Sequence, residues 1–209
     1  MAGRRESSEI ARRLLGVALA ANGIHLTAEQ LVRPALELFK LIQEHSGVEV
    51  SLAHCRGLVM AGLAPGRIGI DCERPGRKRS WCAMADLYFS ADEARAIRSL
   101  PVNQREAAFL RHWTLKESMV KATRGSVFTN LNRLVVESSG EDPRARTAEP
   151  GTWFAWQGQL GDCAAGLVCA PPDRPGLRLF ECPDPCGSNA SAECFRELEA
   201  QGPGLFRLQ

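Results

Sequence analysis

The sequence predicts an α+β fold with two similar lobes, because a helical pattern followed by three strand-like segments occurs twice along the chain. Its 209 residues, 44% of them hydrophobic, can bury a substantial core and suit one large domain or two small lobes. The formal net charge is only +2, so composition gives no support to nucleic-acid binding. We therefore expect function to depend on local motifs.

The first half of the chain combines helical patterns with short strands. An amphipathic pattern over residues 7–22 predicts a helix that stops at Gly23. The following segment, residues 26–45, has helical composition but contains Pro34, which disfavours one continuous helix. Beyond it, apolar runs between turn residues predict a three-stranded antiparallel meander. Its strands are expected at residues 48–54, 57–64 and 67–73.

The second half repeats this order. Ser90 and Glu93 have the spacing of a capping box and predict a helix start in the segment FSADEARAIRSL. The longest helical pattern covers residues 104–125 and ends at Gly125. Three further strands are expected at residues 131–139, 152–159 and 163–170, with loop or tail at 138–151 and 171–209.

The N-terminal segment superficially resembles a secretory signal, with arginines ahead of the apolar run LLGVALAA. Glu6 and Glu9 interrupt the basic part and the apolar run is short, so we expect a surface helix in a cytoplasmic protein. No run approaches the ~20 apolar residues of a membrane span, and no membrane association is expected.

The eight cysteines are expected to be reduced thiols, because a secreted disulfide scaffold would normally be shorter and more cysteine-dense. Cys182, Cys186 and Cys194 cluster in the Pro/Gly-rich tail. Their spacing is poor for zinc and no histidine is nearby, so we predict no metal site there.

The segment IGIDCE contains the first candidate site residues. Side chains alternate along a strand, so Asp71 and Glu73 share one face, roughly 6–7 Å apart. Two carboxylates so placed repel each other unless a cation lies between them, and an all-oxygen site suits Mg2+ or Mn2+. A solvated strand end beside arginines is the alternative interpretation.

The segment WTLKESMVKA interrupts an apolar helical run with charges. Glu117 and Lys121 are four residues apart and lie on one helix face, with Lys116 about 100° away. A surface ion pair that contributes roughly a few tenths of a kcal/mol is the simplest interpretation. In the alternative, Glu117 joins the two strand carboxylates at a metal and the lysines neutralise phosphate oxygens, as in phosphoryl transfer.

Together the two segments resemble the paired signature of the 4'-phosphopantetheinyl transferases, (V/I)-G-(V/I)-D-x-E and (F/W)-(S/C/T)-x-K-E-(A/S)-x-x-K. Both match at every defined position, about forty residues apart. SLAHC, YFSADE and ARRLLG resemble further elements of the family, so the resemblance runs from about residue 11 to 170. It implies the larger, surfactin-synthetase-activator type: a monomer of two similar lobes related by pseudo-twofold symmetry, each a small antiparallel sheet packed with helices.

The resemblance also implies a division of the chain. An N-terminal lobe over residues 1–75 would contribute the coenzyme A-binding part, and a C-terminal lobe over residues 76–170 would carry the motif helix. Residues 171–209 would form a C-terminal extension. The family usually has more chain ahead of its opening helix, so we expect the N-terminal lobe to be shortened.

The implied activity is Mg2+-dependent transfer of 4'-phosphopantetheine from coenzyme A to a serine hydroxyl of an apo acyl or peptidyl carrier protein, with release of 3',5'-ADP. By motif position, Asp71, Glu73 and Glu117 would bind Mg2+, with Mn2+ as a substitute. Glu117 would also be placed to remove the serine proton. Lys121 would contact a coenzyme A phosphate, and Lys116 would hold the pyrophosphate or orient the serine.

At the nucleotide end of the implied site, His54 would contact the 3'-phosphate of coenzyme A, with Arg12 beside it. Lys40 stands at the lysine position of the family's G-K-P element, which appears here only as FKL. The S-H-S element has become AHC. Fatty-acid, polyketide and peptide-synthetase carriers all present a serine at a helix start, so the sequence does not identify the carrier.

Two other functions stay open at this stage. A non-catalytic carrier-binding member of the same family would suit the shortened N-terminal part, and an unrelated metal-dependent phosphohydrolase could use the same carboxylates. The intact lysine and glutamate positions argue against the first, and the S-H-like element and the motif spacing argue against the second. The basic residues Arg74, Arg77, Lys78 and Arg79 form either a solvated loop or a surface that steers an acidic carrier protein.

Overall fold

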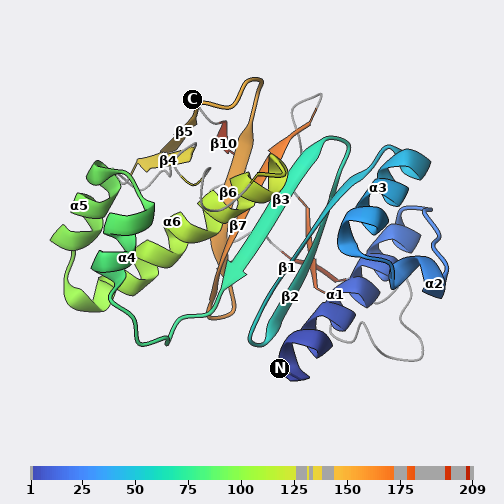
Figure 1. The fold of residues 1–209 in the computed structure, drawn as a ribbon, viewed down its shortest axis with the longest axis horizontal. Coiled ribbons are helices and arrows are strands. Elements are labelled where there is room, and N and C mark those ends of the chain that lie inside the picture. The colour runs from blue at the N-terminus through green and yellow to red at the C-terminus, as the bar shows by residue number, and fades with distance from the viewer. Residues whose placement is uncertain are drawn as a thin grey trace.

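The computed structural model of the protein describes residues 2–125, 131, 134–137, 144–171, 178–181, 196–198 and 206–207. Helices and small antiparallel sheets make up this part of the chain (Figure 1), which confirms the predicted α+β class. The first half contains α1 (Ala2–Ala21), α2 (Ala28–Leu31), α3 (Ala35–Ser46), β1 (Glu49–Cys55), β2 (Leu58–Ala64) and β3 (Arg67–Glu73). The rest contains α4 (Trp81–Tyr88), α5 (Ala91–Ser99), α6 (Val102–Ala122), β4 (Leu134–Glu137), β5 (Arg144–Thr147), β6 (Phe154–Leu160), β7 (Cys163–Ala170), β8 (Leu179–Glu181), β9 (Arg196–Leu198) and β10 (Phe206–Arg207).

Local sequence signals set the helix boundaries. α2 and α5 each begin with a capping box, formed by Thr27 with Gln30 and by Ser90 with Glu93. Pro34 stands immediately before α3 and separates it from α2, because its ring and missing N–H do not fit a helix interior. The predicted helix break and the predicted start of α5 are therefore confirmed.

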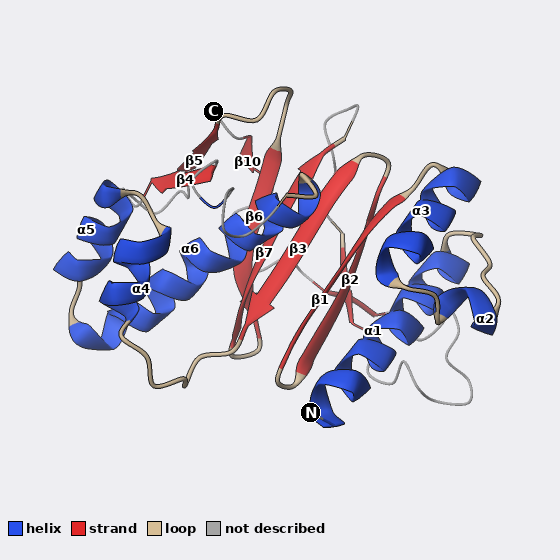
Figure 2. Ribbon diagram, viewed as in Figure 1, coloured by secondary structure: helices blue, strands red, loops and turns tan. Residues whose placement is uncertain are grey.

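The two halves of the chain meet at the strand pair β3–β7. β1 and β2 form one antiparallel pair, whereas β3 belongs to a second sheet with the order β10-β6-β7-β3. β3 and β7 pair over the whole of β3, starting with Arg67 opposite Ala170. β1 lies beside β3 (Figure 2), where the Ile70 amide donates to Ser51 Oγ at 3.1 Å. The three predicted strands are confirmed, but the predicted meander is wrong because β3 forms its ladder with β7 and not with β2.

Helices cover these strands and form separate core clusters with them. On the first half, α1 and α3 pack on β1 and β2 through buried aliphatic residues, namely Leu15, Leu19, Leu38, Ile42 and Val50. α6 lies across β3 and β7 (Figure 1), and buries Leu115 and Met119 against Trp153 and Val168. This packing brings the second sequence motif onto the first.

Other parts of the chain differ from the sequence prediction. α4 was not anticipated, and β5 lies within residues 138–151, which we predicted to be loop. β8, β9 and β10 lie within the predicted tail, where β10 pairs with β6. These strands are very short, so their own sequences carry little periodicity and their pairing depends on partners elsewhere. In the part of the chain that the structure describes, no helix has the length and apolar character to cross a membrane.

The division into lobes over residues 1–75 and 76–170, with an extension over 171–209, stays a prediction. The order of helices followed by strands does occur twice, as expected. However, β3 of the first part and β7 of the second share one sheet. Any two lobes of this protein are therefore joined by backbone hydrogen bonds.

Candidate active site

Two glycines allow α6 to lie directly on the strands that carry the candidate site. A Cβ atom at Gly69 of β3 would come within 1.9 Å of the Ser118 carbonyl oxygen, and one at Gly166 of β7 within 2.8 Å of Thr114. Ser118 also donates from its Oγ to the Gly166 carbonyl at 3.0 Å. The helix carrying the second motif is thereby held against the strand carrying the first.

Asp71 and Lys121 form the central contact of the site. Lys121 Nζ lies 2.8 Å from Asp71 Oδ1 and donates a second hydrogen bond, also of 2.8 Å, to the Ile70 carbonyl. The Asp71 side chain is only 14% exposed, and its buried Oδ2 has no hydrogen-bond partner in the described structure. Burial raises the pKa of Asp71 above its ordinary value, although the charges of Lys121 and His54 oppose this shift.

Glu73 and Glu117 are the other two carboxylates of the predicted set. Each is partly buried, and burial is the main reason that the pKa of each is raised above its ordinary value. The negative charge of Asp71 raises both pKa values further, and the charge of Glu73 adds to the effect on Glu117. The fold thus brings three carboxylates close enough to repel one another.

This concentration of negative charge fits a divalent cation. Mg2+ is usually held by one or two carboxylates, with water and substrate phosphate as its remaining ligands. Asp71 Oδ2 is a buried oxygen acceptor that lacks a donor. Among the described residues, no three His, Cys, Asp or Glu side chains are close enough together to form a full metal-binding set. The oxygens present therefore fit an ion that shares its ligands with a phosphate, and the ligand assignments stay predictions.

Lys116 does not lie at this site, contrary to its predicted role in holding pyrophosphate or orienting serine. Its side chain is 0% exposed, and its Nζ lies 3.0 Å from Glu93 Oε1. It also donates to the carbonyl oxygens of Leu131, at 3.1 Å, and Leu134. Lys116 and Lys121 leave α6 in different directions, so only Lys121 reaches Asp71. Lys116 does not fit the predicted role, because the three hydrogen bonds of its ammonium group go to Glu93 and to two carbonyl oxygens inside the protein.

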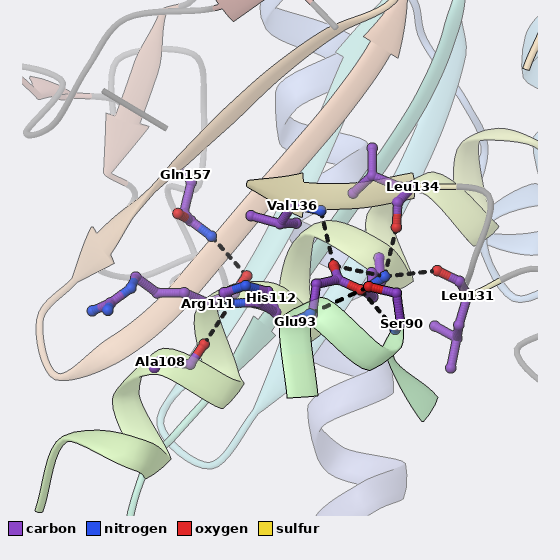
Figure 3. Close-up of polar contacts among 10 residues, drawn as sticks. Ser90, Glu93, Ala108, Arg111, His112, Leu131, Leu134, Val136 and Gln157 are labelled. Carbon is purple, nitrogen blue, oxygen red and sulfur yellow. Dashed lines mark hydrogen bonds and ion pairs between the residues drawn. The ribbon is translucent and has the colours of Figure 1, made fainter. Parts of the chain in front are cut away.

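Glu93 is as buried as its lysine partner and accepts further hydrogen bonds. Its Oε1 accepts from the Val136 amide at 2.8 Å and its Oε2 from the Ser90 amide at 2.8 Å (Figure 3). Burial disfavours its ionised form, but the charge of Lys116 and these hydrogen bonds outweigh it, and the pKa of Glu93 lies below its ordinary value. This network joins α5, α6 and β4 behind the candidate site.

The three residues predicted for the nucleotide end are spread over the first half of the chain. His54 is exposed on β1 and near enough to Asp71 to affect the pKa of that carboxyl. Arg12 donates to the carbonyl oxygens of Leu31, at 2.8 Å, and Arg33, and so holds the end of α2. The side chain of Lys40 on α3 is 73% exposed, and its Nζ lies 3.7 Å from Glu44 Oε1. Of these three, the structure connects only His54 with the carboxylates.

A small, open surface cleft lies beside Glu73. One part of its wall is basic and the other is mainly aromatic; the lining residues are Glu73, Arg74, Arg77, Arg79, Trp81, Met84, Phe109, Leu110 and Trp113. Trp113 is half-buried and stacks on Phe109 with ring centroids 5.6 Å apart. Arg77, Lys78 and Arg79 are exposed, as a solvated or partner-binding loop requires.

Sequence reasoning missed several residues that build the site. Gly166 was not singled out, although its lack of a side chain lets α6 approach β7. Glu93 was recognised only as part of a capping box. His112 is buried, with Nδ1 2.9 Å from the Ala108 carbonyl oxygen, although no pattern in the sequence indicated a partner for it. The tail cysteines Cys182, Cys186 and Cys194 lie outside the described residues.

Comparison with known proteins agrees with this arrangement. The 4'-phosphopantetheinyl transferase superfamily model matches residues 67–170, about half of the chain. Over 144 residues the chain is 29% identical to the 4'-phosphopantetheinyl transferase psf-1 of Bacillus pumilus. This alignment covers 66% of this chain and 60% of the relative. Over 126 residues it is 30% identical to the 4'-phosphopantetheinyl transferase HetI of Nostoc sp. That alignment covers 60% of this chain and 53% of the relative.

The matched region contains both motif elements, β3 and α6, in the contact described above. The chain belongs to the 4'-phosphopantetheinyl transferase superfamily. Its alignments span 60% and 53% of the lengths of these two curated relatives. Family membership confirms the resemblance carried by the two motifs and sets aside the unrelated phosphohydrolase considered above.

Proposed function

We propose that this protein transfers the 4'-phosphopantetheine group of coenzyme A to a serine hydroxyl of an apo acyl or peptidyl carrier protein, with 3',5'-ADP as the second product. One observation carries the proposal: α6 lies on β3 so that Glu117 and Lys121 meet Asp71 and Glu73 in one partly buried, negatively charged site. Family membership supports the same reaction.

The charges of the site suit a pyrophosphate substrate only if a cation offsets the carboxylates. We propose that Asp71, Glu73 and Glu117 hold Mg2+, for which Mn2+ could substitute. Binding of the ion would then draw these carboxylates closer together than they lie in this structure. The ion would withdraw charge from the pyrophosphate and so make its phosphorus easier to attack. Lys121 would exchange part of its contact with Asp71 for a phosphate oxygen of coenzyme A, since its side chain is about one-third exposed.

The transfer itself requires a nucleophile, a base and a leaving group. The serine Oγ forms a bond to the phosphorus that carries pantetheine, and the bond from this phosphorus to the bridging oxygen breaks. That oxygen leaves with 3',5'-ADP. Glu117 is the base in this proposal, because burial and the neighbouring carboxylates raise its pKa and so make it a better proton acceptor. His54, exposed on the neighbouring strand, is the residue we propose for the 3'-phosphate.

Lys116 has no direct part in this proposal. Its Glu93 pair supports α6 from the side away from the carboxylates, and so positions Glu117 on the same helix. Lys40 and Arg12 are likewise left outside the proposed chemistry, because Lys40 lies with Glu44 and Arg12 holds the end of α2. We propose a monomer in the cytoplasm as the working form.

The decisive experiment incubates the full chain with coenzyme A, Mg2+ and an apo carrier protein, and weighs the carrier by mass spectrometry. We expect the carrier to gain the mass of one phosphopantetheine and 3',5'-ADP to appear in equal amount. Asp71→Asn should abolish the gain, whereas Glu44→Gln, which removes an exposed carboxylate remote from the site, should not.

The same experiment separates the remaining alternative. A non-catalytic family member would bind the apo carrier in a pull-down but leave its mass unchanged with every carrier class supplied. Full transfer in excess EDTA would instead remove the metal from the proposal while leaving the reaction in place.

A further inference from the structure

A group of three thiols lies on the face of the β3–β7 pair that is turned away from α6. Cys72 of β3 is buried in the core cluster that also contains Ile70 and Trp156, and Cys55 at the end of β1 packs against this cluster. Cys163, the first residue of β7, is buried beside them. The proposed transfer chemistry uses none of these side chains, so their proximity needs another explanation.

One contact in this group of thiols joins the two halves of the chain. Cys55 Sγ lies 3.6 Å from Cys163 Sγ, although the residues are 108 positions apart in the sequence. Both residues are at strand ends, where a small change in side-chain rotation can bring the sulfurs to the bonding distance of about 2 Å. Cys55 is partly exposed, whereas Cys72 and Cys163 are buried, so an oxidant from solvent reaches Cys55 first.

Charged neighbours favour reaction at Cys55. Arg74 lies beside the pair and is held by Asp162, with Nη1 to Oδ2 at 2.7 Å. Hydrogen bonding from Cys72 is the main reason that the pKa of Cys55 falls to about 7, with contributions from Cys163 and Arg74, while burial and Glu73 oppose the shift. A thiolate at Cys55 and a nearby second thiol are the two components that reversible disulfide formation needs.

We propose that Cys55 and Cys163 form a reversible redox site, in which a peroxide converts the two thiols to a disulfide that links β1 to β7. The Cys55 thiolate attacks hydrogen peroxide and becomes a sulfenic acid, with hydroxide as the leaving group. The Cys163 thiol then attacks this sulfur, a disulfide forms and water leaves. In total, two thiols are oxidised, one peroxide is reduced and two waters are released.

The cross-link would affect β3, the strand that lies between the two cross-linked strands. β3 carries Asp71 and Glu73 and lies between β1 and β7. A disulfide from Cys55 to Cys163 would therefore fix the position of β3 between its neighbours and restrict the unfolded chain over a long loop. The oxidised protein should melt at a temperature several degrees above that of the reduced protein.

The test treats the reduced full chain with hydrogen peroxide, blocks the remaining thiols and maps the peptides by mass spectrometry. We expect two of the eight thiols to disappear, with Cys55 and Cys163 in one linked peptide pair and the link lost on addition of dithiothreitol. Cys55→Ser and Cys163→Ala should each remove this link and the rise in melting temperature. Cys82→Ser, which alters another partly exposed thiol, should keep both.

Several results would overturn the proposal. A principal link from Cys55 to Cys72, or to one of the tail cysteines, would mean that the pair is wrongly assigned. Oxidation of Cys55 to a sulfinic acid without any link would show that Cys163 does not resolve the sulfenic acid. Because the linkage is mapped on the unsubstituted protein, the test does not depend on either variant folding.

Discussion

Lys116 and Glu93 form an ion pair that is closed to solvent, with Nζ 3.0 Å from Oε1 and side-chain exposures of 0% and 2%. The lysine also lies 5.2 Å from the centre of the Phe89 ring. Such a pair gives little net stability relative to apolar residues of similar size, but the loss of one partner leaves a buried charge without compensation. The lysine of the second motif thus has a structural role that its pattern in the sequence does not reveal.

The first prediction follows from this pair. Lys116→Met should lower the free energy of unfolding by roughly 3–5 kcal/mol, because it leaves Glu93 charged and buried. Glu93→Gln should also lower it, because Lys116 then stays buried without an opposite charge, but by less, since the glutamine oxygen can still accept a hydrogen bond from Lys116. Urea unfolding measures both, with Lys40→Met as the control on an exposed lysine. Normal stability of Lys116→Met together with a large loss of kcat would instead make Lys116 a catalytic residue.

The second prediction concerns Lys121. The simplest interpretation of the sequence was a surface ion pair of Lys121 with Glu117, but the structure pairs Lys121 with the buried Asp71. Lys121→Met should therefore raise KM for coenzyme A and also lower the free energy of unfolding at neutral pH by about 1–2 kcal/mol, after allowance for its partial exposure. Equal KM values for this variant and the unsubstituted protein would take Lys121 out of the substrate site.

The pH dependence of the Lys121 variant has a defined sign. Burial already raises the folded-state pKa of Asp71, so between its unfolded and folded pKa values the native protein binds more protons than the unfolded chain. Stability therefore falls as pH rises through that interval, which begins near the ordinary aspartate pKa of about 4. Loss of Lys121 removes a positive charge that lowers the folded-state pKa of Asp71, so the interval then extends to higher pH. The stability deficit should thus shrink as the pH is lowered toward 4.

The third prediction separates two roles of Glu117. Its pKa is raised by burial and by Asp71 and Glu73, so in metal-free protein Glu117→Gln should raise the free energy of unfolding by about 0.5–1 kcal/mol. The same variant should show a smaller gain in melting temperature from Mg2+. At saturating Mg2+ its kcat should stay roughly 100-fold or more below normal, because an amide cannot accept the serine proton.

These two readouts for Glu117 distinguish the roles. Full recovery of kcat at high Mg2+ would make Glu117 a ligand only, and an unchanged response of the melting temperature to Mg2+ would make it a base only. Glu44→Gln, a change of the same charge at an exposed residue, is the control for both measurements.

The fourth prediction concerns the exposed basic loop at one side of the cleft. Replacement of Arg77, Lys78 and Arg79 together by glutamine should lower kcat/KM for an acidic carrier about tenfold and weaken its dependence on salt, with kcat nearly unchanged. Steering acts on encounter and not on the chemical step. The control removes three exposed basic residues from other surfaces, namely Arg13, Lys40 and Arg95. If both triple variants had the same salt dependence, the loop would have no special part in carrier binding.

Local patterns in the sequence predicted most of the first half of the fold and the proximity of the three carboxylates. Strand alternation placed Asp71 and Glu73 on one face, and a capping box placed the start of α5 at Ser90. The burial of Lys116 could not be predicted in this way. Helical periodicity gives the angle between Lys116 and Glu117 around the helix axis, but it does not show that Glu93 of α5 packs against that side of α6. Strand β3 was also given the wrong neighbour, because pairing with β7 depends on contacts between distant parts of the chain.

The fifth prediction tests the contact on which the whole site depends, the approach of α6 to β3 at Gly69. A Cβ atom here would lie 1.9 Å from the Ser118 carbonyl oxygen and 2.6 Å from the Ala122 amide nitrogen, so the backbones must separate to admit it. Gly69→Ala should therefore lower the free energy of unfolding by about 1–3 kcal/mol. It should also move Glu117 and Lys121 away from Asp71 and reduce kcat at least tenfold, which added Mg2+ should not restore.

Gly62→Ala of β2 provides the matched control for Gly69→Ala. The nearest atoms to its new Cβ would be side-chain methyl groups of Ile68 and Ile70, at 3.0 and 3.1 Å, and not backbone atoms, so a slight shift of these side chains can admit it. We expect a change in unfolding free energy below about 1 kcal/mol and no loss of kcat at saturating coenzyme A. If Gly69→Ala and Gly62→Ala both kept full kcat, the close contact of α6 with β3 would not be what brings the carboxylates together. The proposed site would then need a different geometry in the working protein.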